Sequence, residues 1–273
     1  MIKSIEPVYK KISMLLFVGA VTVLSLLSAM TPRIKEPAAP VATNLSVKVV
    51  DSFSNLAYNK LYETLNLDSL ELSREAFTYA VKGYNNLVAQ GAVLKQDVLS
   101  IVDYSLPSSK KRLFIIDLAT GKLLFNTFVS HGRNSGLEQA TRFSNDLNSF
   151  QSSLGFFITG KAYKGEHGYS LRLDGLEKGF NDNALNRGIV IHAANYVNEK
   201  IAQQRGYIGR SLGCPAVPVK LHRAIIKKIK DGSCLFLYGA DTNYTARSPM
   251  INGADAFPLN KGLIQSTLTD STI

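Results

Sequence analysis

Short apolar runs with strand character follow one another through the middle of the chain. Between residues 98 and 239 they read VLSIVDY, RLFIIDL, LLFNTFVS, GFFITG, YSLRL, GIVIHAA and CLFLYG, separated by Gly, Asn, Ser and Pro. β-Branched and aromatic residues favour strands, and the separating residues favour turns. The segment DLATGK, between the second and third runs, is typical of a hairpin turn. The pattern predicts a mostly antiparallel β domain over residues 97–240, built as a sandwich or a barrel.

Helical periodicity precedes this region. Apolar residues have helical spacing over residues 57–65 and 77–88, and Ser73 is well placed to cap the second of these helices. We therefore expect a helical segment over residues 56–96. A further helix is predicted over about 218–230, directly after a glycine-bearing turn. The predicted fold class is mostly β, within the α+β class.

The N-terminal segment has the features of an export signal. Three lysines in the first 11 residues precede MLLFVGAVTVLSLLSAM, a run without a charge. A basic region followed by a long apolar region predicts a signal peptide over residues 1–30, and the run is close to the lower length for a membrane anchor. Both readings place the protein outside the cytoplasm, in the periplasm or cell envelope, and the second would anchor it at the inner membrane. Residues 31–55, with three prolines in their first ten positions, predict a linker, and the polar residues 241–273 a loosely held C-terminal tail.

Composition and charge restrict the function classes. With 45% hydrophobic and 19% charged residues, the chain is not expected to be disordered. Its net charge of +10 suits an anionic envelope or an acidic polymer. The sequence lacks the basic helix or aromatic-interleaved basic patch that would favour nucleic acid, so no nucleic-acid partner is expected.

The two cysteines differ in their surroundings. Cys214 lies in GRSLGCPAV, which predicts a tight, exposed turn, whereas Cys234 begins an apolar run and is expected to face a core. Export leaves a disulfide between them open, although a turn thiol and a core thiol are poorly placed for one. Neither cysteine has neighbours at metal-ligand spacing, and no glycine-rich phosphate loop is present. We expect no metal and no cofactor.

One histidine is placed to act on the exposed thiol. His192 ends the predicted strand GIVIH, where a side chain can leave the sheet for the edge of a site. Imidazole can remove a thiol proton, and the backbone N–H at Gly213 could hold a developing oxyanion. The residues therefore permit cysteine acyl transfer by Cys214. The remaining histidines are expected in loops or on a solvated helix face, with a substrate contact open for the first: His131, His167 and His222.

The order of several segments resembles a known family. IVIHAANYV followed by IGRSLGCPAVP is similar to the active-site signature of the murein L,D-transpeptidase catalytic domain, the YkuD-like cysteine transpeptidases. The resemblance continues, in order, through LSREAFTYAVKGYNNL, VSHGRNSG, FSNDLNSFQSSLGFFITG, HGYSLRLDGLEKGFNDNA and GSCLFLYG. It covers roughly residues 55–240 and implies an L,D-transpeptidase-like fold.

The resemblance also implies roles for individual residues. Cys214 would be the nucleophile and His192 its base, with backbone N–H groups of Gly213 and Cys214 as oxyanion donors. Arg210 and Ser211 would shape the turn and meet a substrate carboxylate. The resemblance also implies that Tyr169 lines the site. The implied substrate is the stem peptide of peptidoglycan, cleaved between an L-centre and the terminal D-residue and transferred to an amine.

Two positions depart from the better-known members of the family. Leu212 stands where they carry His, and Ala216 where they carry Arg or Asn. A carboxylate would then be recognised by another cation, such as Arg210 or Arg172. Two alternatives remain open: a hydrolase on the same site, an L,D-carboxypeptidase or endopeptidase, and a non-catalytic module that binds the cell wall.

Overall fold

The structure, a computed structural model, describes residues 57–93 and 95–253. The predicted signal segment and linker lie outside these residues. Residues 57–64 are helical. The other elements, in chain order, are α3 Arg74–Ala89, β1 Val98–Asp103, β2 Leu113–Asp117, β3 Lys122–Thr127, β4 Gly155–Gly165, β5 Gly168–Gly175, β6 Val190–Ala194, α4 Glu199–Arg205, β7 Ala216–Pro218, α5 His222–Ile229, β8 Cys234–Tyr238, α6 Thr242–Arg247 and α7 Pro249–Asn252. None of the described helices is long and apolar enough to cross a membrane.

The strands form one eight-stranded sheet in the order β3-β2-β1-β8-β4-β5-β6-β7. Two neighbouring pairs, β1–β8 and β6–β7, are parallel, and the others are antiparallel. Each run that predicted a strand forms one, and the hairpin turn between β2 and β3 lies where DLATGK predicts it. The predicted α+β class with a mostly antiparallel sheet is confirmed.

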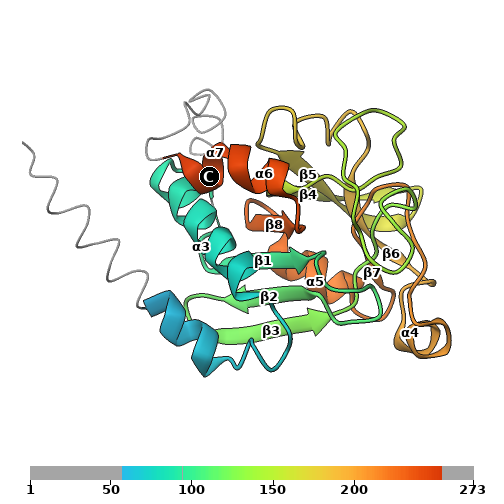
Figure 1. Cartoon of the computed structure of the whole chain (residues 1–273), viewed down its shortest axis with the longest axis horizontal. Helices are drawn as coiled ribbons and strands as arrows, with labels where there is room; N and C mark the ends of the chain where they lie inside the picture. Colours follow the sequence, from blue (N-terminus) through green and yellow to red (C-terminus); the bar gives the residue numbers. More distant parts are fainter. Residues whose placement is uncertain (1–56, 94, 254–273) are drawn as a thin grey trace, which may run out of the picture. The chain divides into compact units, whose positions relative to one another are not determined.

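Part of the hydrophobic core lies between this sheet and helix α3, which packs across β1 and β8 (Figure 1). Buried isoleucines of α5 belong to the same core. All residues of β1, β2 and β8 are buried, and α3 buries one apolar face against them. A Cβ on Gly83 would lie 2.0 Å from Cζ of Phe156, so glycine lets the helix approach the sheet closely. Ser73 caps the helix as predicted, since its side chain accepts a hydrogen bond from the Ala76 N–H.

The expectation of a loosely held tail from residue 241 is corrected for the described part. Residues 242–252 form α6 and α7, and Tyr244 from α6 is buried against the core. The buried carboxylate of Glu177 holds these helices, because it accepts hydrogen bonds from Tyr244 Oη (2.9 Å) and from the hydroxyl of Ser248. The same carboxylate accepts one from the backbone N–H of Phe156 in β4 (2.7 Å). The C-terminal helices are therefore part of the domain.

Three further differences concern the segments around the cysteine turn. A short strand, β7, comes directly after the turn, and α5 begins only at His222 instead of near Pro218. The helix therefore begins four residues later than predicted, eight residues after Cys214. Helix α4, which lies between β6 and the turn, was not predicted; it is capped by Asn198, whose side chain accepts from the Ile201 N–H.

Candidate active site

The turn that carries Cys214 is closed by the hydroxyl of Ser211. This hydroxyl accepts a hydrogen bond from the Gly213 N–H (3.0 Å) and donates one to the Cys214 carbonyl (2.6 Å). The backbone of Ser211 is paired in turn with the preceding loop, donating to His131 O (2.9 Å) and accepting from Arg133 N (2.8 Å). Ser211 is 6% exposed, so its role is to shape the turn; the expected contact with a substrate carboxylate is not favoured.

Gly213 occupies a position that only glycine fits. Its φ is +127°, and an added Cβ would lie 2.8 Å from the carbonyl oxygen of Gln151. Its N–H is already bonded to Ser211, so the expectation that Gly213 offers a free oxyanion donor is corrected. Among the described residues, the N–H of Cys214 takes part in no hydrogen bond. The donor left at this turn is therefore the amide of Cys214 itself.

The thiol of Cys214 is partly exposed and directed at the backbone that leads into β6. Its sulfur donates to Gly188 O at 3.6 Å. Burial raises the pKa of the Cys214 thiol above its ordinary value, while the Val190 N–H and the Arg187 guanidinium act in the opposite direction. The net shift is upward, so the resting group is the neutral thiol.

His192 lies on β6, 4% exposed, with its ring covered by another imidazole. Its Nδ1 lies 3.0 Å from the carbonyl of Ala193 and must carry the proton, because a carbonyl only accepts. Nε2 is then the basic atom. Burial lowers the pKa of His192, and the neighbouring His167, stacked at a centroid distance of 4.3 Å, lowers it further. The histidine is neutral at neutral pH.

Strand pairing brings the cysteine turn next to His192. Strands β6 and β7 are parallel, with His192 opposite Ala216. Cys214 lies in the turn that leads into β7, two residues before Ala216, so its place is diagonal to that of His192 on the neighbouring strand. Neighbouring strands are about 4.8 Å apart. No hydrogen bond joins the two side chains among the described contacts, and apo sites often tighten only when substrate binds.

The other expected site residues are dispersed. Arg210 is exposed and uses Nη1 to hold the backbone carbonyls of Arg133 (2.9 Å) and Gly136 (3.0 Å), so it joins two loops next to the turn. Tyr169, on β5, packs with α5: the guanidinium of Arg223 lies 5.5 Å above its ring, and His222 is 6.5 Å away. The structure thus places Tyr169 beside α5, and no hydrogen bond of the described residues joins it to the cysteine turn.

His131, left open as a substrate contact, is a structural residue. It is fully buried, and its Nδ1 accepts a hydrogen bond from Nη2 of the buried Arg112 (2.7 Å). Its Nε2 therefore carries the proton and donates to Gly136 O (3.2 Å). Burial and the Arg112 charge lower the pKa of His131 to about 4. The neutral imidazole supports the loop to which Ser211 is paired.

Sequence reasoning missed two residues at this site. Arg187 lies just before β6 and contacts both the cysteine turn and the loop 144–153. His167, at the tip of the β4–β5 hairpin, was expected to be a loop residue only and instead covers His192. The one local signal is a cation and an imidazole close to strand ends. Their partners lie far away in the sequence, so spacing could not reveal them.

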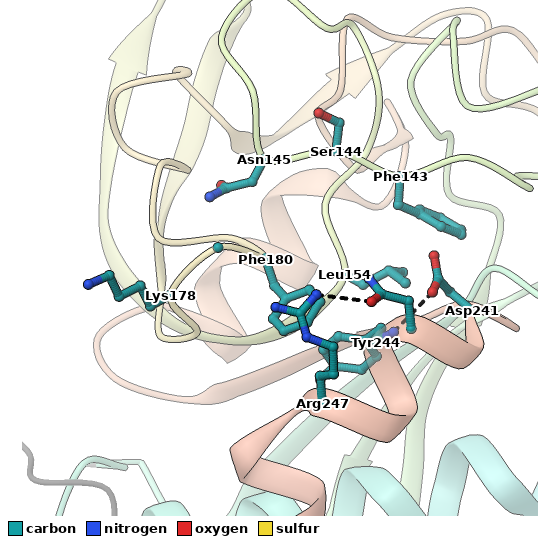
Figure 2. Close-up of a pocket in the computed structure, with 11 residues that line it drawn as sticks. Phe143, Ser144, Asn145, Leu154, Lys178, Phe180, Asp241, Tyr244 and Arg247 are labelled. Carbon is teal, nitrogen blue, oxygen red and sulfur yellow. Dashed lines mark hydrogen bonds between the residues drawn. The ribbon is translucent and has the colours of Figure 1, made fainter.

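A separate pocket lies between the loop 143–145, the turn 178–180 and α6. Its volume is about 150 Å³, and its lining contains neither Cys214 nor His192. Figure 2 shows Phe180 and Tyr244 at its floor, with the Arg247 side chain beside them. The described residues contain no group of three or more His, Cys, Asp or Glu side chains placed to share a metal ion.

A family model agrees with the sequence resemblance. Residues 68–238 match the model of a family described as the L,D-transpeptidase catalytic domain (YkuD_2). Similar solved structures include an L,D-transpeptidase from Mycobacterium smegmatis, with 13% identity, 52% of this chain and 59% of that chain covered, and a TM-score of 0.33. An L,D-transpeptidase (Yku) from Stackebrandtia nassauensis has 13% identity and a TM-score of 0.32, with 61% of this chain and 68% of that chain covered. The helical cell shape determining protein Pgp2 from Campylobacter jejuni has 14% identity and a TM-score of 0.34, with 62% of this chain and 58% of that chain covered.

The match to the M. smegmatis structure covers 59% of the length of that chain. No curated protein matches the chain.

Proposed function

Because the chain belongs to the L,D-transpeptidase catalytic domain family, we propose that it is a peptidoglycan-modifying cysteine acyl transferase that acts on stem peptides through a thioester on Cys214. One observation carries this proposal. The parallel pairing of β6 with β7 sets the cysteine turn diagonally beside His192. Nδ1 of His192 is engaged with Ala193 O, which leaves Nε2 as the basic atom. A thiol in the turn before β7 and a neutral imidazole on the neighbouring strand β6 are suited to nucleophilic acyl transfer.

The acylation step begins from a neutral pair. The raised pKa of Cys214 and the lowered pKa of His192 disfavour a thiolate–imidazolium pair at rest, so the proton moves as the sulfur attacks. For this the thiol turns from Gly188 O towards His192, and Nε2 takes its proton. The sulfur bonds to the carbonyl carbon of the L-centre, and the Cys214 N–H is the backbone donor available to the oxyanion that forms.

Collapse of this intermediate breaks the bond to the D-residue. The imidazolium of His192 returns its proton to the leaving amine, and the acyl group stays on Cys214 as a thioester. An acceptor amine then attacks the thioester and gives a proton to His192, and the imidazolium returns that proton to the sulfur as the C–S bond breaks, which restores the thiol. Water in place of the amine gives the hydrolase outcome, so the acceptor decides between transpeptidation and hydrolysis.

We propose that the protein acts outside the cytoplasm, where its proposed substrate lies. The basic and apolar features of residues 1–30, which lie outside the described residues, support export with cleavage or anchoring. Cell fractionation followed by N-terminal sequencing tests this: recovery of the chain only from the cytoplasm would contradict it.

Incubation with purified muropeptides tests the reaction. We expect mass spectrometry to show loss of the terminal D-residue and, when an amine acceptor is added, a product that carries it. Cys214→Ala should abolish both products, whereas Cys234→Ala, which removes the buried thiol, should retain both. Loss of the D-residue without acceptor incorporation would replace the transferase by the hydrolase. Binding of muropeptides with no product would support the wall-binding module.

A further inference from the structure

Arg187 is a cation with only neutral partners. Its Nη1 donates to Ser144 O (2.6 Å) and to the hydroxyl of Ser153 (2.5 Å). Its Nη2 donates to the hydroxyl of Ser149 (3.1 Å) and to Gln151 O (2.6 Å). No carboxylate of the described residues forms a salt bridge with it. The guanidinium is thus fixed in place, but its charge is not paired.

This guanidinium lies against the cysteine turn. Its Nη2 is 3.3 Å from the position of a Cβ on Gly213, the residue before Cys214, and Gln151 O, which it binds, is 2.8 Å from the same position. Arg187 is half-buried, and burial lowers its pKa, whereas a negative charge on Cys214 would raise it. The arginine is therefore an unpaired cation with a nascent anion beside it.

The other groups near the sulfur cannot supply this charge. Tyr104 and Tyr196 lie within electrostatic range of Cys214, but burial raises both pKa values, that of Tyr104 to about 12, so both phenols are neutral. Asp146 also acts electrostatically on Arg187, but its carboxylate is negative and so cannot stabilise a thiolate. On β6, His192 is neutral at rest. Among these groups Arg187 alone is permanently positive.

We propose that Arg187 is a positioning residue that stabilises the Cys214 thiolate and holds the loop 144–153 against the cysteine turn. The first role rests on the proposed function, in which a thiolate develops during acylation. A cation within about 4–6 Å of an acid typically lowers its pKa by one to three units. Arg187 would offset part of the burial that otherwise keeps Cys214 protonated.

The pH dependence of alkylation tests this role without using peptidoglycan. In a Cys234→Ala background, the rate of iodoacetamide labelling of Cys214 is measured between pH 6 and pH 11 for the parent and for Arg187→Gln. We expect the apparent pKa of labelling to rise by at least one unit, which slows labelling about tenfold at neutral pH. Arg187→Lys, which keeps the charge but not the fork of hydrogen bonds, should stay within half a unit of the parent.

Matched variants separate electrostatics from folding. Arg142→Gln removes an exposed arginine that donates to Asn134 O (3.2 Å) from the neighbouring loop, and it should leave the profile unchanged. Arg187→Met retains the side-chain length without the charge and serves if the glutamine variant does not fold. An unshifted profile in a folded neutral variant, or equal shifts in the lysine and glutamine variants, would overturn the proposal. Absence of turnover on muropeptides, with the shift present, would instead contradict only the proposed function.

Discussion

Replacing Gly213 with alanine tests whether the turn geometry sets the position of Cys214. The new Cβ would lie 2.8 Å from Gln151 O, 3.1 Å from Cδ1 of Ile189 and 3.3 Å from Nη2 of Arg187. A backbone carbonyl cannot rotate away as a side chain can, so the turn itself must move. A strained φ costs about 1–3 kcal/mol, and overpacking adds about 1–3 kcal/mol. We expect a loss of about 2–6 kcal/mol in the free energy of unfolding.

Gly206→Ala provides the matched control. Gly206 has a φ of +77°, and a Cβ there would meet no atom within 4 Å. Only the conformational cost remains, about 1–2 kcal/mol. The difference between the two variants isolates the contacts made by the cysteine turn.

Urea unfolding, followed by circular dichroism, measures both losses. Under conditions where both variants are folded, iodoacetamide labelling of Cys214 and muropeptide turnover report on the site. We expect Gly213→Ala to lose at least tenfold in turnover and Gly206→Ala to keep the parent rate. Equal destabilisation of the two variants, or parental labelling and turnover in Gly213→Ala, would refute the reasoning.

Three further predictions follow from the same geometry. His192→Ala should lower the turnover number by about 10²–10⁴-fold, the usual contribution of a general base, and near-parental steady-state rates would assign the base elsewhere. The pKa of His131 is about 4 in the folded protein and 6.5 ordinarily, so the unfolded chain takes up a proton first as the pH falls. The difference corresponds to about 3 kcal/mol of folding stability, which is fully present above pH 6.5 and is lost as the pH falls from 6.5 to 4. Urea titrations at pH 7 and pH 4 should show a smaller loss in His131→Gln, and an equal loss would exclude this residue as the cause. Cys234→Ala should stay active and lose about 1 kcal/mol, because Cys234 is fully buried in β8; inactivity of the folded variant would contradict its structural role.

Local signals explain what the sequence predicts correctly. The strand runs have dense β-branched and aromatic residues between turn residues, and Ser73 caps α3 through a bond three residues away. The core position of Cys234 follows from the apolar run that it begins. Each of these features is decided within a few residues.

Elements with short or weak patterns escape such reasoning. β7 is only three residues long and follows a Gly-Cys-Pro turn, so nothing marks it as a strand. α4 buries a single residue, Ala202, and therefore lacks apolar periodicity. α6 and α7 are held by the buried carboxylate of Glu177, more than 60 residues away in the sequence.

The site shows the same limit. A cysteine in a glycine-bearing turn and a histidine at a strand end could be singled out from their surroundings. The sequence could not show that the Gly213 N–H is already bonded to the hydroxyl of Ser211, because that bond exists only in the folded turn. The partners of Arg187 lie 34 to 43 residues away, so its place beside Cys214 emerges only from tertiary structure.

The central claim is a thioester on Cys214, and trapping it is the most direct test. The protein is mixed with a tetrapeptide-stem muropeptide without acceptor, quenched in acid within the first turnover, and digested for mass spectrometry. We predict an adduct with the mass of the substrate less its terminal D-residue, located on the peptide that contains Cys214 and released by hydroxylamine. An adduct on any other residue, or full turnover by Cys214→Ala, would contradict the account.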